Sequence, residues 1–196
     1  MRYLMGLVYV FLGVMMLATG KAQAGDPENT LIMELASGPV VIEMRPDLAP
    51  QHVARIKELT RQGFYNGVVF HRVIDGFMAQ TGDPSGTGAG GSGKKLKAEF
   101  SSPSVAKHIR GTVSMARAGN PDSADSQFFI CFKPAPFLNG QYTIWGQVVE
   151  GMDNVDKIKK GSESDNGRVT DPDRIITMRV AADPKVDDKT KTDDKK

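Results

Sequence analysis

The sequence predicts a mainly β fold, a closed antiparallel β-barrel flanked by two α-helices. Short apolar runs rich in β-branched and aromatic residues recur along the chain, each bounded by Gly, Pro, Asn or Asp. Only two stretches have helical spacing, and strands do not alternate regularly with helices as they do in parallel α/β folds. A closed barrel is favoured because it leaves no exposed sheet edge.

The predicted elements follow one another along the chain. Residues 30–36 and 39–44 are separated by a Ser-Gly pair, which predicts a β-hairpin. Residues 47–62 begin with Asp, place apolar side chains at helical spacing and are followed by Gly63, which predicts a capped amphipathic helix. A second, short helix is predicted over residues 152–160. The remaining apolar runs are predicted to be strands: residues 68–74, 77–80, 112–116, 127–132, 142–150 and 174–180.

Residues 1–24 are predicted to be a secretory signal peptide. Arg2 precedes an apolar run over residues 4–17, and residues 22–24 (Ala-Gln-Ala) provide the small side chains of a cleavage site. A membrane anchor is the alternative, but the run is shorter than the ~20 apolar residues that a spanning helix needs. We therefore expect cleavage after Ala24 and an exported, soluble protein with no membrane association afterwards.

The rest of the chain is interpreted as one domain with a tail. No linker or long internal repeat divides residues 25–182. Residues 183–196 contain Val186 as their single apolar side chain, so they cannot offset the entropy of ordering and we expect a charged, disordered tail. We expect the protein to be a monomer.

Composition excludes several classes of function. The 25 basic and 23 acidic residues nearly balance, which gives no electrostatic case for nucleic-acid binding. The single cysteine, Cys131, excludes an intramolecular disulfide and a zinc site built from several thiolates. The three histidines lack the spacing of a metal site, and we expect neither a metal nor another cofactor.

A glycine-rich stretch over residues 86–95 is similar to a nucleotide-binding loop. No helix is predicted after it, so no helix N-terminus would be available to bind a phosphate. We interpret the stretch as a surface loop, either flexible or forming the rim of a binding groove.

The most informative stretch is residues 70–84 (FHRVIDGFMAQTGDP), where Arg72 lies among apolar side chains. Strand alternation lets Arg72 point away from the core that Phe70 and Val73 indicate. A buried cation is tolerated when it is paired, so a salt-bridged barrel residue is one interpretation. A functional cation on an apolar wall is the other.

Several short motifs follow one another in order along the chain: FHRVI at 70–74, FMAQ at 77–80, GD at 82–83, GTVSMARAG at 111–119, SQFFICF at 126–132, FLNG at 137–140 and GQV at 146–148. With these motifs the chain resembles the cyclophilins, a family of peptidyl-prolyl cis-trans isomerases. The resemblance covers roughly residues 30–182 and implies a bacterial exported, periplasmic member with an eight-stranded antiparallel barrel and two capping helices.

The resemblance implies a role for each residue of the groove, with Arg72 as the catalytic residue. Four apolar side chains would line the pocket for the proline ring: Phe77, Met78, Phe129 and Leu138. The others would hold the substrate backbone, border the site of the preceding residue or form the rim: Gln80, Gln127, Ala116, Arg117, Ala118 and Gly86.

Three groove positions depart from the pattern that is commonest in eukaryotic members. Phe137 stands where Trp is usual, Tyr142 where His is usual and Arg117 where Asn is usual. These changes resemble bacterial members. In the family, tight cyclosporin binding relies on the indole nitrogen at the first of these positions, so the resemblance implies weak cyclosporin binding.

Alternation within residues 127–132 (QFFICF) predicts which side chains face the groove. Gln127 and Phe129 share one strand face, whereas Phe128 and Ile130 share the other. The polar Gln127 marks the first face as the groove, and Cys131 falls on the same side. Phe128 and Ile130 are therefore expected to belong to the core.

The expected reaction is rotation about Xaa-Pro peptide bonds in unfolded or flexible polypeptides, which would assist the folding of exported proteins. The barrier of ~18–20 kcal/mol arises from amide resonance, and in the twisted state the proline nitrogen gains a localised lone pair. A guanidinium donor such as Arg72 would stabilise that state. Two alternatives remain open: a chaperone that binds proline segments with little turnover, and a structural envelope protein that uses its charged tail.

Overall fold

The computed structural model describes residues 25–184, and the predicted signal peptide and residues 185–196 of the predicted tail lie outside the described residues. The strands are β1 Thr30–Leu35, β2 Gly38–Met44, β3 Arg72–Ile74, β4 Met78–Thr81, β5 Thr112–Met115, β6 Phe128–Cys131, β7 Ile144–Glu150 and β8 Thr177–Val180. The helices are α1 Pro50–Arg61 and α2 Met152–Asp156, with short 3₁₀ turns η1 Pro27–Asn29, η2 Pro121–Ser123, η3 Pro136–Leu138 and η4 Glu163–Asp165.

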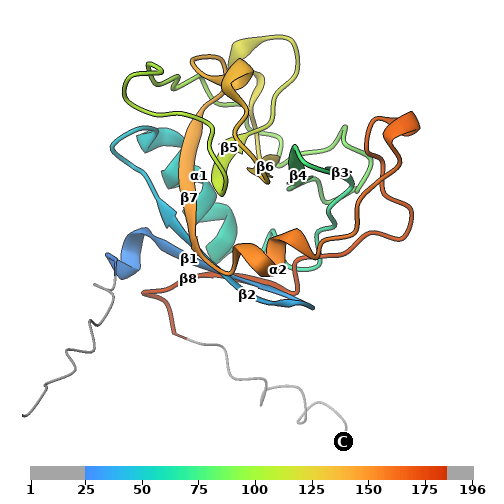
Figure 1. Ribbon diagram of the computed structural model, residues 1–196. Coiled ribbons are helices and arrows are strands. Elements are labelled where there is room, and N and C mark those ends of the chain that lie inside the picture. Colours follow the sequence, from blue (N-terminus) through green and yellow to red (C-terminus); the bar gives the residue numbers. More distant parts are fainter. Residues whose placement is uncertain (1–24, 185–196) are drawn as a thin grey trace, which may run out of the picture.

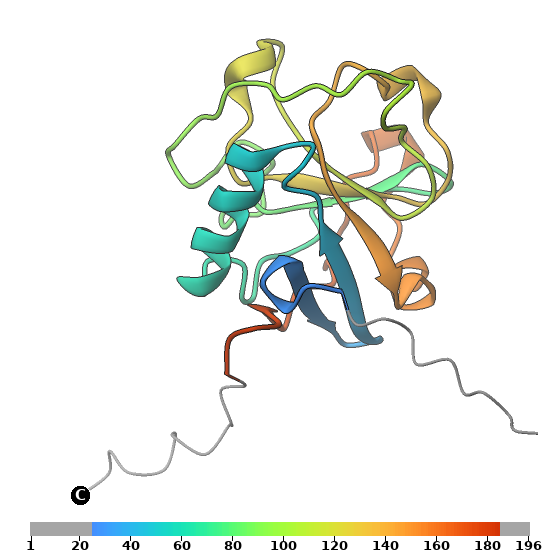
Figure 2. The same ribbon diagram turned by 90° about the vertical axis from the view of Figure 1, so that its left-hand side faces the viewer.

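All eight strands form one antiparallel sheet in the order β3-β4-β6-β5-β7-β2-β1-β8. The sheet curls into a half-barrel, and α1 lies beside it (Figures 1 and 2). The mainly β fold with eight strands and two helices is confirmed, but the closed barrel is wrong. Among residues 25–184 no strand pair joins β3 to β8, so the sheet has two edges.

The sheet stays open because the segments that should close it are irregular. The sequence predicted full strands over residues 68–74 and 174–180, whereas β3 and β8 occupy only the final part of each run. The stretches before them meet at an isolated bridge between Val69 and Arg174, and the Val73 amide donates to the Gly167 carbonyl at 2.7 Å. Left-handed residues in the segment before β8 cannot continue an extended ladder, which explains the gap.

Helix α1 packs its apolar face on the sheet as predicted, but its first turn is capped differently. Asp47, the predicted cap, pairs with Arg45 at 2.6 Å instead. The carboxylate of Glu99 accepts hydrogen bonds from the backbone amides of Gln51 and His52, each at 3.1 Å. A distant side chain therefore satisfies the free amides at the start of the helix. Gly63 beyond the helix has φ of 69°, as the predicted end of the helix requires.

The sheet separates two apolar clusters of different size. The main core lies on one side and includes Trp145, Tyr65 and Phe128, all fully buried. A smaller cluster contains Met78 and Phe129 together with Cys131, Ala135 and Leu138. The division of β6 between core and groove faces is confirmed, because Phe128 and Ile130 belong to the main core whereas Phe129 and Cys131 belong to the smaller cluster.

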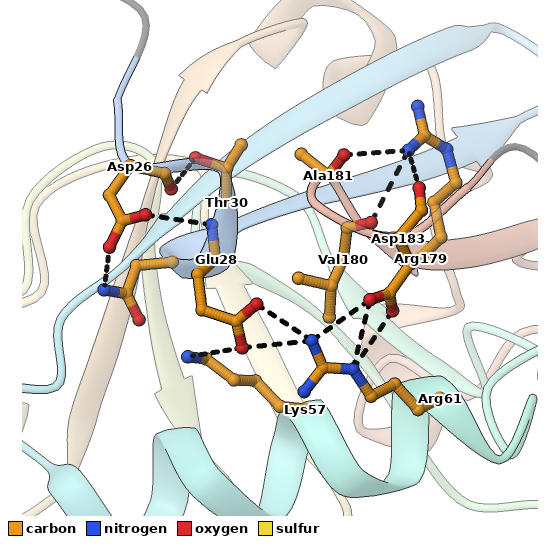
Figure 3. Close-up of polar contacts among 10 residues, drawn as sticks. Asp26, Glu28, Thr30, Lys57, Arg61, Arg179, Val180, Ala181 and Asp183 are labelled. Atoms are coloured by element: carbon orange, nitrogen blue, oxygen red, sulfur yellow. Dashed lines mark hydrogen bonds and ion pairs between the residues drawn. The ribbon is translucent and has the colours of Figure 1, made fainter.

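The two ends of the described chain lie side by side next to α1 (Figure 3). Arg61 pairs with Glu28 at 3.0 Å and with Asp183 at 3.1 Å, and Lys57 reaches Glu28 at 3.5 Å. The segment before β1 and the segment after β8 are thus both held on one helix. No helix among residues 25–184 has the length and apolar character needed to cross a membrane.

Candidate active site

Strand pairing brings the candidate residues into one row across the sheet. Arg72 on β3 faces Gln80 on β4, Gln80 faces Phe129 on β6, and Phe129 faces Ser114 on β5. Residues paired across antiparallel strands have side chains on the same face. The row therefore places the cation, the amide and the aromatic ring next to one another, although they are distant in the sequence.

Arg72 is held by neutral oxygens. Its Nη1 donates to Gln80 Oε1 at 3.2 Å, its Nε donates to the carbonyl of Asn166 at 3.0 Å, and its Nη2 donates to Asn166 Oδ1 at 2.9 Å. No carboxylate of the described residues forms an ion pair with Arg72, so the interpretation as a salt-bridged barrel residue is wrong. Burial lowers the pKa of Arg72, but a guanidinium stays protonated at neutral pH.

A chain of amide hydrogen bonds extends from Arg72 toward the glycine-rich loop. Because Gln80 accepts from Arg72 through its oxygen, its amide nitrogen is free to donate, and Nε2 donates to Gln127 Oε1 at 2.9 Å. Gln127 in turn donates through Nε2 to the carbonyls of Gly88 and Gly90, at 3.0 and 2.8 Å. A single assignment of donors and acceptors therefore accounts for every hydrogen bond in this series. That assignment fixes the orientation of the side-chain amides of both glutamines.

The glycine-rich loop is anchored by two carboxylates. Asp83 is fully buried and accepts from the amides of Ser85, Gly88 and Gly90 at 2.8, 2.6 and 3.1 Å. Burial alone would raise the pKa of Asp83, but the hydrogen bonds from Ser85, Gly90 and Gly88 outweigh it and lower that pKa to about 2. Asp125 accepts from the amides that follow Gly91, at 2.8 and 3.0 Å. The loop is thus the fixed rim of a groove.

An apolar cavity of about 410 Å³ opens beside Arg72. Met78, Phe129 and Leu138 form its buried floor, and Phe137 stands at the mouth with 63% of its surface exposed. The full lining is Arg72, Phe77, Met78, Gln80, Ala116, Arg117, Phe129, Phe137, Leu138, Gln141 and Tyr142. The structure therefore gathers the predicted catalytic residue and all four predicted pocket residues around one concave, mainly apolar space.

A second cavity, of about 520 Å³, lies between the glycine-rich loop and residues 116–118. It shares Gln80, Ala116 and Arg117 with the first cavity, so the two form one continuous groove. Gln127 and Ala118 also line this cavity. Gly86, which the resemblance placed on the rim, lines neither cavity, and a Cβ atom at its position would lie 3.0 Å from Val69.

Arg117 forms the wall between the two cavities. Its Nε and Nη2 donate to the carbonyl of Gln141 at 3.2 and 3.0 Å, and its Nη1 donates to the carbonyl of Ala118 at 2.9 Å. The guanidinium also lies 4.5 Å from the ring centroid of Tyr142. Two of the three departures noted in the sequence are therefore in direct contact with each other.

Sequence reasoning missed Asn166, Gln141 and the two loop-anchoring carboxylates. Asn166 precedes Gly167, and an Asn-Gly pair is a turn signal that the sequence does display. That signal indicates a left-handed turn, but it contains no information that the turn touches Arg72. The two residues are 94 positions apart, so only the folded chain reveals the contact.

Comparisons with known proteins agree with this geometry. The family described as "Cyclophilin type peptidyl-prolyl cis-trans isomerase/CLD" matches residues 30–180. A "Probable peptidyl-prolyl cis-trans isomerase" of Brucella suis biovar 1 (strain 1330) is 57% identical over 180 residues, which are 86% of this chain and 90% of the relative. A "Peptidyl-prolyl cis-trans isomerase" of Helicobacter pylori (strain ATCC 700392 / 26695) is 47% identical over 127 residues, 63% of this chain and 76% of the relative.

Solved structures show the same fold. The cyclophilin AquaCyp293 from Hirschia baltica superposes with a TM-score of 0.71 at 29% identity, covering 81% of this chain and 76% of that chain. A cyclophilin-type isomerase from Cryptosporidium parvum, crystallised in the presence of the dipeptide Ala-Pro, has a TM-score of 0.69 at 29% identity, covering 77% of this chain and 98% of that chain.

Fold, groove and comparisons together define the class as an enzyme that rotates peptide bonds preceding proline. The chain belongs to the cyclophilin-type peptidyl-prolyl cis-trans isomerases. The reaction makes and breaks no covalent bond, which fits a site that offers hydrogen-bond donors beside an apolar cavity.

Proposed function

We propose that the groove binds Xaa-Pro segments of unfolded or flexible polypeptides, that Arg72 is the catalytic residue, and that the enzyme assists the folding of exported proteins in the periplasm. The observation that carries the proposal is the position of Arg72 at the edge of an apolar cavity, where no carboxylate of residues 25–184 pairs with its guanidinium. A cation neutralised by a carboxylate would be a weaker donor to a developing lone pair.

The apolar cavity would receive the proline ring. Phe77, Met78, Phe129 and Leu138 would surround it, and Gly86 would belong to the rim of the groove. Gln80 and Gln127 would hold the substrate backbone beside the ring, because their orientation is already fixed by the amide chain. The second cavity, bordered by Ala116, Arg117 and Ala118, would accept the residues that precede proline.

Arg72 would act on the twisted peptide bond. Rotation removes the conjugation of the proline nitrogen, and an N–H donor aimed at the localised lone pair stabilises the twisted state more than the planar one. Lowering the ~18–20 kcal/mol barrier by about 7 kcal/mol would accelerate exchange roughly 10⁵-fold. Preorganised hydrogen bonding and exclusion of water from the cavity would share that amount.

The decisive experiment follows cis-trans exchange of an Ala-Pro peptide by NMR exchange spectroscopy with residues 25–196. The parent protein is expected to accelerate exchange strongly, and Arg72→Ala to reduce kcat/KM at least tenfold, about 1.4 kcal/mol of transition-state stabilisation. Arg45→Ala is the matched control, because Arg45 pairs with Asp47 at the surface and does not line the groove. Its rate should equal that of the parent.

The same experiment separates the enzyme from a chaperone that only binds proline segments. A holding chaperone would use the apolar cavity but would not need the guanidinium, so it would bind the peptide without accelerating exchange. A folded parent protein that binds the peptide and leaves the exchange rate unchanged would favour the chaperone and refute the proposed reaction.

The periplasmic location is supported by the pattern of Arg2, the apolar run and the Ala-Gln-Ala triplet at residues 22–24. Expression of the full chain in a Gram-negative host, followed by osmotic-shock fractionation and N-terminal sequencing, tests it. The periplasmic protein should begin at Gly25. Recovery of the uncleaved chain from the cytoplasm would refute export.

Weak cyclosporin binding is proposed because Phe137 offers no indole N–H at the mouth of the cavity. Titration of the exchange activity should show incomplete inhibition at equimolar inhibitor. Phe137→Trp should tighten the inhibition, which the same titration measures relative to the uninhibited rate of the variant itself. A stoichiometric titration of the parent protein would contradict this proposal.

A further inference from the structure

Asn166 has a left-handed backbone conformation, which residues other than glycine adopt uncommonly and which asparagine tolerates better than most. It has φ of 51°, in the left-handed region that costs energy for residues with a side chain. Such conformations persist where the surrounding structure forces them, and they cluster at functional sites. Asp171, in the same segment, is the other residue of the described chain that is not glycine and has positive φ, also 51°. The two positions share a backbone geometry but differ in their contacts.

Asn166 contributes two acceptors to a single guanidinium. Its backbone oxygen accepts from Arg72 Nε at 3.0 Å and its Oδ1 accepts from Arg72 Nη2 at 2.9 Å. The left-handed backbone thus lets one residue occupy one edge of the guanidinium with both oxygens. Gln80 takes the third contact, through Nη1 at 3.2 Å.

The turn that carries Asn166 is fastened to the strand that carries Arg72. The Val73 amide donates to the Gly167 carbonyl at 2.7 Å, and the Gly161 amide donates to the Val73 carbonyl at 2.9 Å. A Cβ atom at Gly167 would lie 2.4 Å from Ile74, so the turn packs directly against β3. Asn166 therefore keeps a fixed position relative to the backbone of Arg72.

We propose that Asn166 is a positioning residue that holds the Arg72 guanidinium in its orientation beside the cavity, an inference that rests on the proposed function. Two neutral oxygens orient the guanidinium and leave its positive charge uncompensated. A carboxylate at the same place would orient it equally well but would reduce the field at the proline nitrogen. The strained asparagine meets both requirements.

The first test replaces the side chain. Asn166→Ala removes Oδ1 and is expected to lower kcat about tenfold with KM within about twofold, because orientation in the transition state is lost while the cavity is intact. Asn166→Gly removes the same oxygen and relieves the strain at φ of 51°. It should show the same loss of kcat without loss of thermal stability.

Asp171→Ala is the matched control. It places alanine at the same φ of 51° in the same segment, and the Asp171 side chain is 94% exposed and does not contact Arg72. Both alanine variants should lower the melting temperature by similar amounts, but Asp171→Ala should keep the parent kcat. Equal losses of kcat in both variants would mean that strain in the segment matters and the Arg72 contact does not, which would overturn the proposal.

A double-mutant cycle connects the effect to Arg72. If Asn166 acts through the guanidinium, Asn166→Ala should cause no further loss in an Arg72→Ala background. The same tenfold loss in that background, or a loss confined to KM, would overturn the proposal.

An NMR readout distinguishes failure of this inference from failure of the proposed function. The Nη2 protons of Arg72, which bind Asn166 Oδ1, should exchange slowly with solvent in the parent and at least tenfold faster in Asn166→Ala, whether or not the protein accelerates peptide exchange. Nη2 protons unaffected by the substitution refute the positioning role. A protein without isomerase activity whose Nη2 protons do respond refutes only the proposed function.

Discussion

The two faces of β6 are buried in different ways. On one face, Phe128 packs edge-on against Tyr65 and Trp145, with ring centroids 5.6 and 5.4 Å away, and all three rings are fully buried. On the other face, Phe129 meets Tyr142 at 5.9 Å and forms part of a cavity wall. Adjacent residues of one strand therefore belong to a sealed core and to an open groove.

The difference shows how one strand can serve two purposes. The main core is enclosed by side chains and depends on apolar packing. The smaller cluster is bordered by polar side chains that remain accessible from the cavity, namely Arg72, Gln80 and Gln127. Substitutions on the two faces should therefore separate into effects on stability and effects on catalysis.

The neighbours Phe128 and Phe129 offer the sharpest test of this separation. Phe128→Ala leaves a void among fully buried rings and should lower the free energy of unfolding by about 3–5 kcal/mol. Phe129→Ala should cost only about 1–2 kcal/mol, because one side of its ring already borders a cavity. Urea denaturation gives both values.

Catalysis should show the reverse order. At a temperature where both variants are folded, Phe129→Ala should reduce kcat/KM for an Ala-Pro peptide at least tenfold, and Phe128→Ala should stay within about threefold of the parent. Similar stability losses together with similar activity losses would show that the two faces are not independent.

Asp83 extends the comparison to the glycine-rich rim. Its carboxyl has a pKa of about 2 in the folded protein, below its ordinary value of 3.8. A carboxyl whose pKa is lowered by folding stabilises the folded protein at pH values above its ordinary pKa. This stabilisation is lost as the pH falls through the pKa of the folded state. Asp83→Asn should therefore lower the free energy of unfolding by about 2 kcal/mol at pH 7, with the difference shrinking between about pH 4 and pH 2.

Urea denaturation across that pH range measures the effect. Asp75→Asn, at an exposed position on the turn between β3 and β4, makes the same change of residue type away from the rim and serves as the control. If the free energy of unfolding of Asp83→Asn were lower than that of the parent by the same amount at every pH, the stabilisation would not come from the ionised carboxylate.

Local patterns predicted much of this architecture. Alternation in residues 127–132 correctly divided β6 between core and groove, and the helical spacing in residues 47–62 correctly predicted α1 and its inner face. Each of these signals lies within the element itself. The four apolar residues implied for the proline pocket also come together around one cavity.

The predictions failed where the determining partner is distant in sequence. Asp47 had the residue type of a helix cap, but Glu99 supplies the contact. Closure of the sheet depended on the segment before β8, whose left-handed residues interrupt pairing with the run before β3. Asn166 displayed a turn signal without any indication that the turn meets Arg72. Contacts between residues so distant in sequence produce no periodic pattern in the sequence from which they could be predicted.

Arg117 and Tyr142 test whether the departures from the common family pattern act as a unit. The guanidinium lies 4.5 Å from the Tyr142 ring centroid, a cation–π contact worth about 0.5–1 kcal/mol at an exposed site. A double-mutant cycle with Arg117→Ala and Tyr142→Ala should give a coupling of that size in the free energy of unfolding. Zero coupling would show that the two changes are independent.

The smallest effect is expected at the ion cluster that holds the two ends of the described chain on α1 (Figure 3). This cluster shares no residue with the lining of the groove. Arg61 there is 42% exposed in its side chain, and its partners Glu28 and Asp183 are also solvent-accessible. Exposed ion pairs contribute about 0–1 kcal/mol and are screened by salt. Arg61→Ala should thus lower the free energy of unfolding by at most about 1 kcal/mol at low salt, and the difference from the parent should vanish at about 1 M salt.

Peptide exchange by Arg61→Ala should equal that of the parent, because Arg61 belongs neither to the groove nor to the main core. Lys57→Ala, which removes the longer contact to Glu28 at 3.5 Å, should have a still smaller effect on unfolding. A loss above about 2 kcal/mol that persists at high salt would exceed what screened surface pairs supply. That result would mean that the contacts between the chain ends and α1 form and break together with the main core. Stability would then depend on these contacts as well as on the core face of β6.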